Sequence, residues 1–197
     1  MLETEELLSL MAHELHEPLR KMATFSELLQ QRSGAVLDQE STEYLQRMQR
    51  ATERMRSTLS CVLAFSRIGR GLPLVTIDLG EVVACALEKA RPTIDAAGAT
   101  VTVSDLPSID GDPFQMQELF EQLLDNSLKF RRDGVPPRVH IHATAGSADG
   151  QHVVLVEDNG LGFDDTYAER IFRPFERLHG RGKYLGAGMG LSICRKI

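Results

Sequence analysis

The amino-acid sequence predicts an α+β protein in which a long helical hairpin precedes a two-layer α/β sandwich with a mixed sheet. Apolar residues recur every three or four positions through residues 8–29 and again through 45–66, as they do in long amphipathic helices. A glycine- and proline-containing stretch at residues 69–73 interrupts this pattern. Short strand-like and helical patterns then follow without regular alternation. We therefore expect a helical domain over residues 1–68, a linker over 69–73 and an α/β domain over 74–197.

Composition and charge limit the classes of protein to consider. The 197 residues are 42% hydrophobic and 25% charged, which suits one or two ordinary globular domains. A formal net charge of -6 argues against binding of nucleic acid through a basic surface. The acidic amino terminus is unlike a signal peptide, and no apolar run approaches the roughly 18 residues of a membrane span. We therefore expect a soluble, cytoplasmic chain without a membrane segment, with Cys61, Cys85 and Cys194 reduced.

The first helix is expected over residues 3–32, and Gly34 is expected to form a left-handed cap after it. Its apolar seam consists of Leu8, Met11, Leu15, Pro18, Met22, Phe25 and Leu29. In that register His13 takes the heptad position farthest from the seam, where a side chain points into water. A single histidine in such a position is most often an ordinary surface residue. Pro18 lies inside the helix close to His13 and Glu14. A proline inside a helix removes a backbone hydrogen bond and usually kinks the helix, so its presence beside an exposed histidine calls for an explanation.

The second helix is expected over residues 38–68, with an apolar stripe that includes Leu45, Met55 and Leu59. Two antiparallel helices form only half of a bundle, and one copy cannot bury both apolar faces. A symmetric homodimer held by residues 1–68, which completes a four-helix bundle, is the simplest solution. The alternative is a hairpin that packs on the second domain of its own chain.

The second domain is expected to contain five strands and two helices before its last segment. The strands are expected at residues 74–77, 99–104, 108–111, 138–145 and 152–157, and the helices at 78–96 and 112–131. Asp78 and Asp112 are favoured N-cap residues, and Pro113 suits the first helical position. Gly98 suits a left-handed cap at the end of the earlier helix. The last two strands form a hairpin across residues 146–150.

Two clusters in this domain carry chemistry. Asn126 and Lys129 lie three positions apart on one helical face, so an amide oxygen and an ammonium group can converge on one ligand. After the last strand, Gly160 and Gly162 allow the backbone to turn sharply and to approach a ligand beside the Asp158 carboxylate. Each cluster by itself is also typical of ordinary structure, the first of a solvated helical face and the second of a common turn.

A third cluster is the glycine-rich stretch of Gly186, Gly188 and Gly190, which opens an apolar helix at the end of the chain. Backbone amides at a glycine-rich helix start bind phosphate well. A dinucleotide-binding interpretation fails because no clear strand precedes the stretch. Residues 172–177, with the sequence Phe-Arg-Pro-Phe-Glu-Arg, stand between the second and third clusters, and the glycines after them allow a flexible lid.

The segment Met-Ala-His-Glu-Leu-His-Glu-Pro-Leu at residues 11–19 resembles the H-box of sensor histidine kinases. The three clusters resemble the N, G1 and G2 boxes of the same family, and residues 172–177 resemble its F-box. These boxes follow the family's order and cover nearly the whole chain. Their amino-acid sequences are similar to those of the bacterial phytochrome-type kinases. The resemblance implies the GHKL-type, or Bergerat, ATP-binding fold for the second domain. It also implies that His13 accepts the phosphoryl group and that Glu14 holds the proton on the other ring nitrogen.

The resemblance further implies a role for each residue of the nucleotide site. Asn126 would coordinate Mg²⁺ at the phosphates of ATP, Lys129 would neutralise phosphate charge and Phe130 would stack on adenine. Asp158 would accept a hydrogen bond from the adenine amino group. Arg177 and Lys183 are the lid charges best placed to approach the triphosphate, and the glycine amides would contact phosphate. The implied activity is ATP-dependent autophosphorylation, followed by transfer to an aspartate of a response regulator receiver domain.

The sequence also departs from the family pattern. Gln122 stands where ATP-hydrolysing relatives of this fold place a glutamate base, so no obvious residue activates water. Leu185 and Ala187 replace the usual acidic residue and threonine of the lid. The chain stops at Ile197, where the family continues with two closing strands, so either the sequence is cut short or the sheet is smaller than usual.

Two other function classes remain open at this point. The first is a phosphotransfer or scaffold module that has lost ATP, against which the intact nucleotide boxes argue. The second is a serine kinase or ATPase of the same nucleotide fold, which would have no reason to carry the H-box hairpin. Neither the input signal nor the regulator can be named from the sequence.

Overall fold

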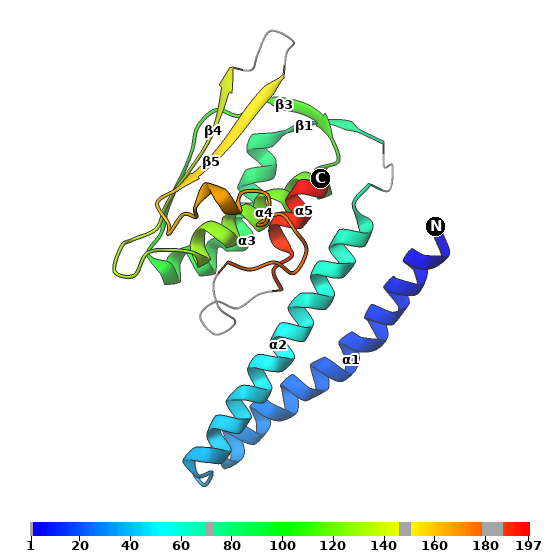
Figure 1. Ribbon diagram of the computed structural model, residues 1–197, viewed down its shortest axis with the longest axis vertical. Coiled ribbons are helices and arrows are strands. Elements are labelled where there is room, and N and C mark those ends of the chain that lie inside the picture. Colours follow the sequence, from blue (N-terminus) through cyan, green and yellow to red (C-terminus); the bar gives the residue numbers. More distant parts are fainter. Residues whose placement is uncertain (1, 70–72, 146–150, 179–186) are drawn as a thin grey trace.

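The computed structural model describes residues 2–69, 73–145, 151–178 and 187–197. It consists of a helical hairpin followed by an α/β part with a mixed sheet, as predicted (Figure 1). The expected loop at 146–150, most of the expected linker, and both Lys183 and Gly186 lie outside the described residues. None of the described helices combines the length and the apolarity needed to cross a membrane.

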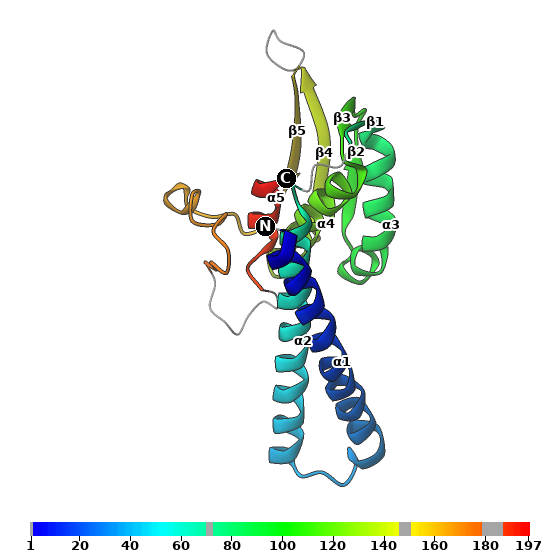
Figure 2. The same cartoon turned by 90° about the vertical axis from the view of Figure 1, so that its right-hand side faces the viewer.

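The hairpin is formed by α1 (Leu2–Ser33) and α2 (Gln39–Arg67), which run antiparallel and project away from the α/β part (Figures 1 and 2). Asp38 caps α2, because its side chain accepts a hydrogen bond of 2.8 Å from the amide of Ser41. The expected left-handed cap at Gly34 is wrong. The φ angle of Gly34 is not positive, and its amide donates a hydrogen bond of 2.9 Å to the Gln30 carbonyl. A Cβ there would lie 2.4 Å from that oxygen, which explains the glycine.

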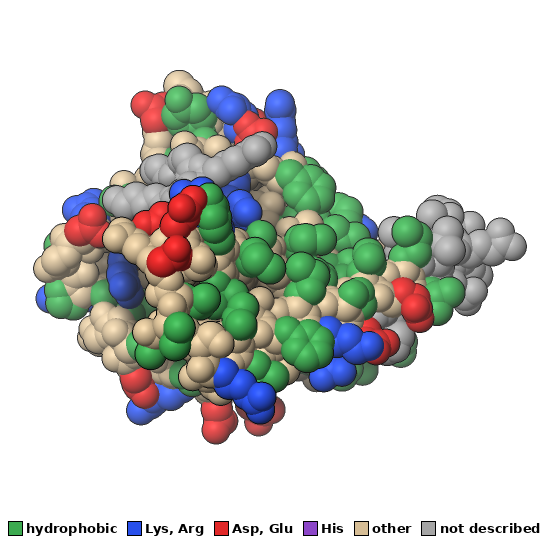
Figure 3. Space-filling model, turned by 90° about the horizontal axis from the view of Figure 1, so that it is seen from below, with side chains coloured by type: hydrophobic (Ala, Val, Ile, Leu, Met, Phe, Trp, Pro, Cys, Tyr) green, Lys and Arg blue, Asp and Glu red, His purple; other side chains and the backbone are tan. Residues whose placement is uncertain are grey.

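The contact between α1 and α2 uses a different stripe from the predicted seam. Ala12, Leu19 and Ser26 are buried on α1, and they recur every seven residues. Leu45 and Thr52 are buried on α2. The seam residues Met11, Leu15, Met22, Phe25 and Leu29 are exposed, together with Tyr44, Met48 and Met55 of α2. Seen from below the molecule, hydrophobic side chains gather on this part of the surface (Figure 3).

The α/β part begins with β1 (Val75–Asp78) and α3 (Leu79–Ala97), followed by the short strands β2 (Thr100–Val103) and β3 (Ser108–Gly111). It continues with α4 (Pro113–Lys129), β4 (Arg138–Ala145), β5 (His152–Asp158), the 3₁₀ turn η1 (Asp165–Tyr167) and α5 (Gly190–Lys196). The predicted caps are confirmed: Asp78 and Asp112 accept backbone hydrogen bonds, and Gly98 is left-handed with φ 60°. The helix α4 ends at Lys129 and not at 131, because the Phe130 carbonyl is engaged by the Leu161 amide at 2.8 Å.

The strands form two separate sheets. β1 pairs antiparallel with β3, whereas β4 lies between a parallel β2 and an antiparallel β5. Val139 and Ile141 of β4 are buried against Val83 of α3 and Leu124 of α4, which cover one face of the larger sheet. Because side chains alternate along a strand, the intervening residues of β4 point to the opposite, outer face.

A second, smaller core joins the hairpin to the end of the chain. Ile68, directly after α2, is buried with Met189 and Ile193 at the start of α5. The partly buried residues that pack around them are Cys61, Ala64 and Phe65 of α2 together with Ala187 and Ile197, which flank α5. The end of the hairpin therefore does pack on the second domain of its own chain, while the stripe on α1 stays exposed.

Candidate nucleotide site

A cavity of about 370 Å³ opens between α2, α4, α5 and the segment that follows β5. Eight of the candidate nucleotide-binding residues line it: Asn126, Lys129, Phe130, Asp158, Gly162, Arg177, Gly188 and Gly190. These residues come from the three clusters and, in the case of Arg177, from the segment between the second and the third. The fold therefore gathers all three clusters around one space.

The wall made by α4 carries the polar pair expected from the spacing. The Nδ2 atom of Asn126 is buried and has no hydrogen-bond partner among the described residues. The Lys129 ammonium lies 5.4 Å from the centroid of the Phe130 ring. Burial lowers the pKa of Lys129, the carboxylate of Asp125 opposes this, and the nearby guanidinium of Arg177 lowers the pKa further. An anion bound in the cavity would stabilise the charged form of this lysine.

The turn after β5 holds the Asp158 carboxylate in a fixed orientation. Its Oδ1 atom accepts a hydrogen bond of 2.8 Å from the amide of Gly160, and its Oδ2 atom accepts one of 3.3 Å from the hydroxyl of Ser127. Gly160 does not line the cavity but supports it, because a Cβ at this position would lie 2.6 Å from the Phe130 carbonyl oxygen. Only glycine allows the turn to pass this close to the end of α4.

Two side chains next to this turn hold it against the rest of the domain. The Asn159 side chain accepts a bond of 2.8 Å from the Arg138 amide and donates one of 3.0 Å to the Pro136 carbonyl. The guanidinium of Arg132 donates to the Gly160 carbonyl at 2.8 Å. Both contacts use polar groups from outside the cavity, so they preorganise Asp158 without occupying the space beside it.

The glycine-rich stretch fits closely against residues 172–177 and α4. Gly188 has φ +72°, and a Cβ there would lie 2.9 Å from the Glu176 carbonyl oxygen. Its own carbonyl accepts a hydrogen bond of 2.9 Å from the amide of Phe175, a non-glycine residue with φ 64°. A Cβ at Gly190 would lie 2.6 Å from Oε1 of Gln122. The glycines therefore let the start of α5 approach the cavity wall, and a strained residue lies beside them.

The phosphoacceptor candidates are separate from this cavity. His13 and Glu14 lie on α1, where Glu14 is exposed and the side chain of His13 is outside the described part. Arg20 and Glu27, which follow His13 at heptad intervals, are exposed. Among the described residues, none from α1 lines the cavity. The structure thus brings the nucleotide clusters together, but it does not bring the H-box to them.

Sequence reasoning missed the contribution of α2 to the cavity wall. Ser57 and Cys61 line it, although both belong to the helical hairpin. Burial raises the pKa of the Cys61 thiol, and the negative charge of Glu118 adds to the increase. No local pattern marks these two positions, because they become cavity residues only when α2 packs against α5.

Two domain families match the chain. Residues 3–71 match the His Kinase A (phospho-acceptor) domain, and residues 111–197 match the family described as Histidine kinase-, DNA gyrase B-, and HSP90-like ATPase. The chain belongs to the sensor histidine kinases. In this kinase, the first match covers the hairpin and the second covers the walls that α4, β5 and α5 contribute to the cavity.

Individual relatives agree with this family. The kinase is 32% identical over 187 residues to the phytochrome-like protein Cph1 of Synechocystis sp., a match that covers 94% of this chain and 25% of the relative. It is 33% identical to cyanobacterial phytochrome A of Nostoc sp., with 94% and 24% coverage. This kinase chain thus spans about a quarter of the length of these relatives.

Solved structures also resemble the chain, one of them along nearly its whole length. The crystal structure of full-length ShkA in complex with AMPPNP has a TM-score of 0.68 and 25% identity, and the match covers 97% of this chain and 40% of that one. The catalytic domain of the histidine kinase ThkA has a TM-score of 0.52 at 20% identity, with 64% of this chain and 80% of that one covered, and it supports the fold alone.

Proposed function

We propose that this chain is the kinase part of a two-component sensor, which transfers the γ-phosphoryl group of ATP to His13. The phosphoryl group would then pass to an aspartate of a response regulator receiver domain. The observation that carries this proposal is the convergence of the three nucleotide clusters on one cavity, next to a hairpin that bears the H-box. The separate positions of His13 and the cavity require that the two domains approach each other for the reaction.

Different residues around the cavity would bind the adenine and the triphosphate of ATP. Asp158, held by Gly160 and Ser127, would accept a hydrogen bond from the adenine amino group, and Phe130 would stack on the base. Lys129 and Arg177 would meet the triphosphate, whose negative charge compensates the repulsion between these two cations. The amides of Gly188 and Gly190 would contact phosphate as well. Lys183 and Gly186 stay predictions for the lid, since both lie outside the described residues.

Asn126 fits the role of a Mg²⁺ ligand. Its side-chain amide lines the cavity and carries one oxygen acceptor that could meet a cation, while the buried Nδ2 atom, which has no hydrogen-bond partner among the described residues, could donate to an oxygen of the bound nucleotide. Oxygen is the donor that Mg²⁺ prefers. When bound, the ion would neutralise negative charge on the phosphates.

At the acceptor, a neutral imidazole nitrogen of His13 would form a bond to the γ-phosphorus while the bond to the oxygen of ADP breaks. Positive charge then builds up on the ring, and Glu14 would stabilise it and hold the proton on the other nitrogen. Gln122 limits the side reaction with water. Its amide donates a hydrogen bond of 2.8 Å to Glu118, and an amide cannot accept a proton from water as a carboxylate does.

The chain would act as a homodimer through residues 1–68. The exposed stripe of α1, including Leu15, Met22 and Phe25, and Met48 and Met55 of α2 would form the interface of a four-helix bundle. A cytoplasmic location, where ATP and receiver domains meet, is part of the same proposal. So is a response regulator as the partner, because phosphohistidine in this family passes its phosphoryl group to a receiver aspartate.

Incubation with γ-labelled ATP and Mg²⁺ tests the function directly. We expect label that is lost in acid and stable in base, as a phosphoramidate is, and we expect His13→Ala to abolish it while nucleotide affinity stays nearly unchanged. His16→Ala, which removes the other histidine of the same helical stretch, is the matched control and should keep the label. Label that persists in His13→Ala would exclude His13 as the acceptor, and an unlabelled wild-type chain that does not bind ATP would favour the phosphotransfer or scaffold module.

A further inference from the structure

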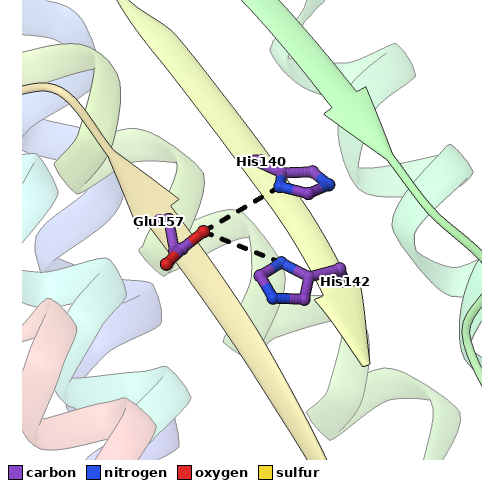
Figure 4. A group of neighbouring side chains, drawn as sticks. All are labelled: His140, His142 and Glu157. Carbon is purple, nitrogen blue, oxygen red and sulfur yellow. Dashed lines mark ion pairs between the residues drawn. The ribbon is translucent and has the colours of Figure 1, made fainter. Parts of the chain in front are cut away.

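A cluster of two histidines and one glutamate lies on the outer face of the larger sheet, away from the nucleotide cavity. His140 and His142 are two residues apart on β4, so their side chains point to the same face. Glu157 of β5 is the register partner of His140 and the diagonal neighbour of His142. All three side chains point toward one another (Figure 4).

The donor atoms of the cluster are already close to a metal-binding arrangement. The Nδ1 atoms of His140 and His142 each lie 3.9 Å from Oε2 of Glu157, and one ligand atom from each residue lies within 4.8 Å of the others. Ligands of a tetrahedral Zn²⁺ ion are separated by about 3.3 Å, given bond lengths of about 2.0–2.1 Å. Rotation of the side chains would have to bring these atoms closer together, and the paired strands already hold the three residues side by side.

The hydrogen bonds around the cluster leave ring nitrogens available to a metal ion. Nε2 of His140 lies 3.0 Å from the hydroxyl of Ser104, so this nitrogen has a partner outside the cluster. If it donates its proton there, its Nδ1 atom presents a lone pair toward Glu157. Nδ1 of His142 is buried and has no hydrogen-bond partner in the described part of the chain.

The two imidazole rings of the cluster also lie face to face. The rings of His140 and His142 stack with centroids 4.5 Å apart and an angle of 22° between their planes. One cation shared by both nitrogens and the carboxylate satisfies all three donors at once.

We propose that His140, His142 and Glu157 bind a divalent first-row transition ion, with Zn²⁺ as the representative. Two imidazole nitrogens and one carboxylate form a ligand set that suits Zn²⁺ and disfavours the oxygen-seeking Mg²⁺ and Ca²⁺. The side chain of His142 is 21% exposed and that of Glu157 is 63% exposed, so the ion has access and water can complete its coordination. Ser104 orients His140 from behind.

The site is independent of the proposed kinase activity, and its position gives it a structural consequence. The bound ion links β4 to β5 next to Asp158, the residue that follows Glu157 and lines the nucleotide cavity. Metal binding therefore stabilises the folded sheet and raises the temperature of unfolding.

The test uses the full chain after removal of metals with a chelator, titrated with Co²⁺ or Zn²⁺ alone, without nucleotide. We expect one equivalent of Co²⁺ with the intense visible absorption of tetrahedral coordination, and an increase in melting temperature with Zn²⁺ but not with Mg²⁺. His142→Ala and Glu157→Gln should each weaken binding by about 100-fold, and Ser104→Ala by about tenfold. His152→Ala is the matched control, because this exposed histidine of β5 lies outside the cluster, and it should bind like the wild type.

Circular dichroism of each variant shows whether the sheet is intact. A wild-type chain without a tetrahedral Co²⁺ spectrum would refute the site. Metal affinity that stays unchanged in folded His142→Ala would assign the ion to other residues and overturn the proposal. The labelling assay with ATP distinguishes this result from failure of the kinase proposal, since neither experiment uses the residues of the other.

Discussion

The ammonium group of Lys196 donates a hydrogen bond of 2.6 Å to the main-chain carbonyl of Phe65, and it lies 4.1 Å from the centroid of the Phe65 ring. These two residues are separated by 131 positions and join α5 to the end of α2. Beside them, Ile68, Met189 and Ile193 form the small core between hairpin and glycine-rich stretch. These contacts therefore hold α5, which forms part of the wall of the nucleotide cavity, against the end of α2.

Lys196→Met should loosen this connection while it retains a long apolar stem. The variant loses one hydrogen bond and one cation–π contact, each worth about 0.5–1.5 kcal/mol. We expect faster amide hydrogen exchange at the end of α2 and in α5, with little change in the core of α3 and α4. Arg195→Met is the control, because Arg195 pairs with Glu169 at 3.1 Å and lies over the ring of Phe172 instead of Phe65. Equal exchange in both variants would contradict the role given to Lys196.

Asp158→Asn should weaken nucleotide binding by on the order of 1–3 kcal/mol, because an amide nitrogen would meet a donor where the carboxylate accepted. The same change disturbs the hydrogen bonds from Gly160 and Ser127 that orient this side chain. Calorimetry with a non-hydrolysable ATP analogue measures the effect. Asp110→Asn, at an exposed carboxylate of β3 outside the cavity wall, should leave the affinity unchanged. An unchanged affinity in Asp158→Asn would show that adenine binds elsewhere.

The exposed stripe of the hairpin predicts a dimer in solution. Phe25 is 67% exposed in the single chain, and Phe25→Glu would bury a charge in the interface, which proteins tolerate poorly without a partner. Light scattering at micromolar concentration should give a dimer for the wild type and a monomer for the variant. Val36→Glu is the control, because Val36 is 87% exposed at the hairpin turn, away from the stripe. A monomeric wild-type chain would count against the bundle.

The three cysteines should react with iodoacetamide in a defined order. The thiolate is the reactive form, and burial raises the pKa of Cys61 and raises that of Cys194 to about 12, so both are mostly protonated near pH 8. Exposed Cys85 should react first. The reaction of Cys61 should accelerate as the pH rises, and bound nucleotide should protect it, because Cys61 lines the cavity. Mass spectrometry of the alkylated peptides measures the rates, and no protection by nucleotide would contradict the assignment of this cavity.

Local patterns were sufficient for the elements and for most candidate residues of the site. Asp112 followed by Pro113 marked the start of α4, and Gly98 marked the end of α3, because caps depend on a few neighbouring residues. Gly34 was misassigned for the same reason. A glycine after a helix fits either a left-handed cap or a close approach to a carbonyl, and the sequence does not distinguish the two.

What the sequence determined by itself was the order of elements, the apolar periodicity of the hairpin, and the residues able to meet a nucleotide, since each depends on spacing along a single segment. Tertiary structure decided which stripe packs within the protomer, where Ala12, Leu19 and Ser26 are buried while the described residues of the predicted seam stay exposed. It also decided that Cys61 lines the cavity and that Glu157 meets His140 and His142. Those relationships join segments far apart in the chain. They arise only when burial of apolar surface fixes the register of strands and the packing of helices.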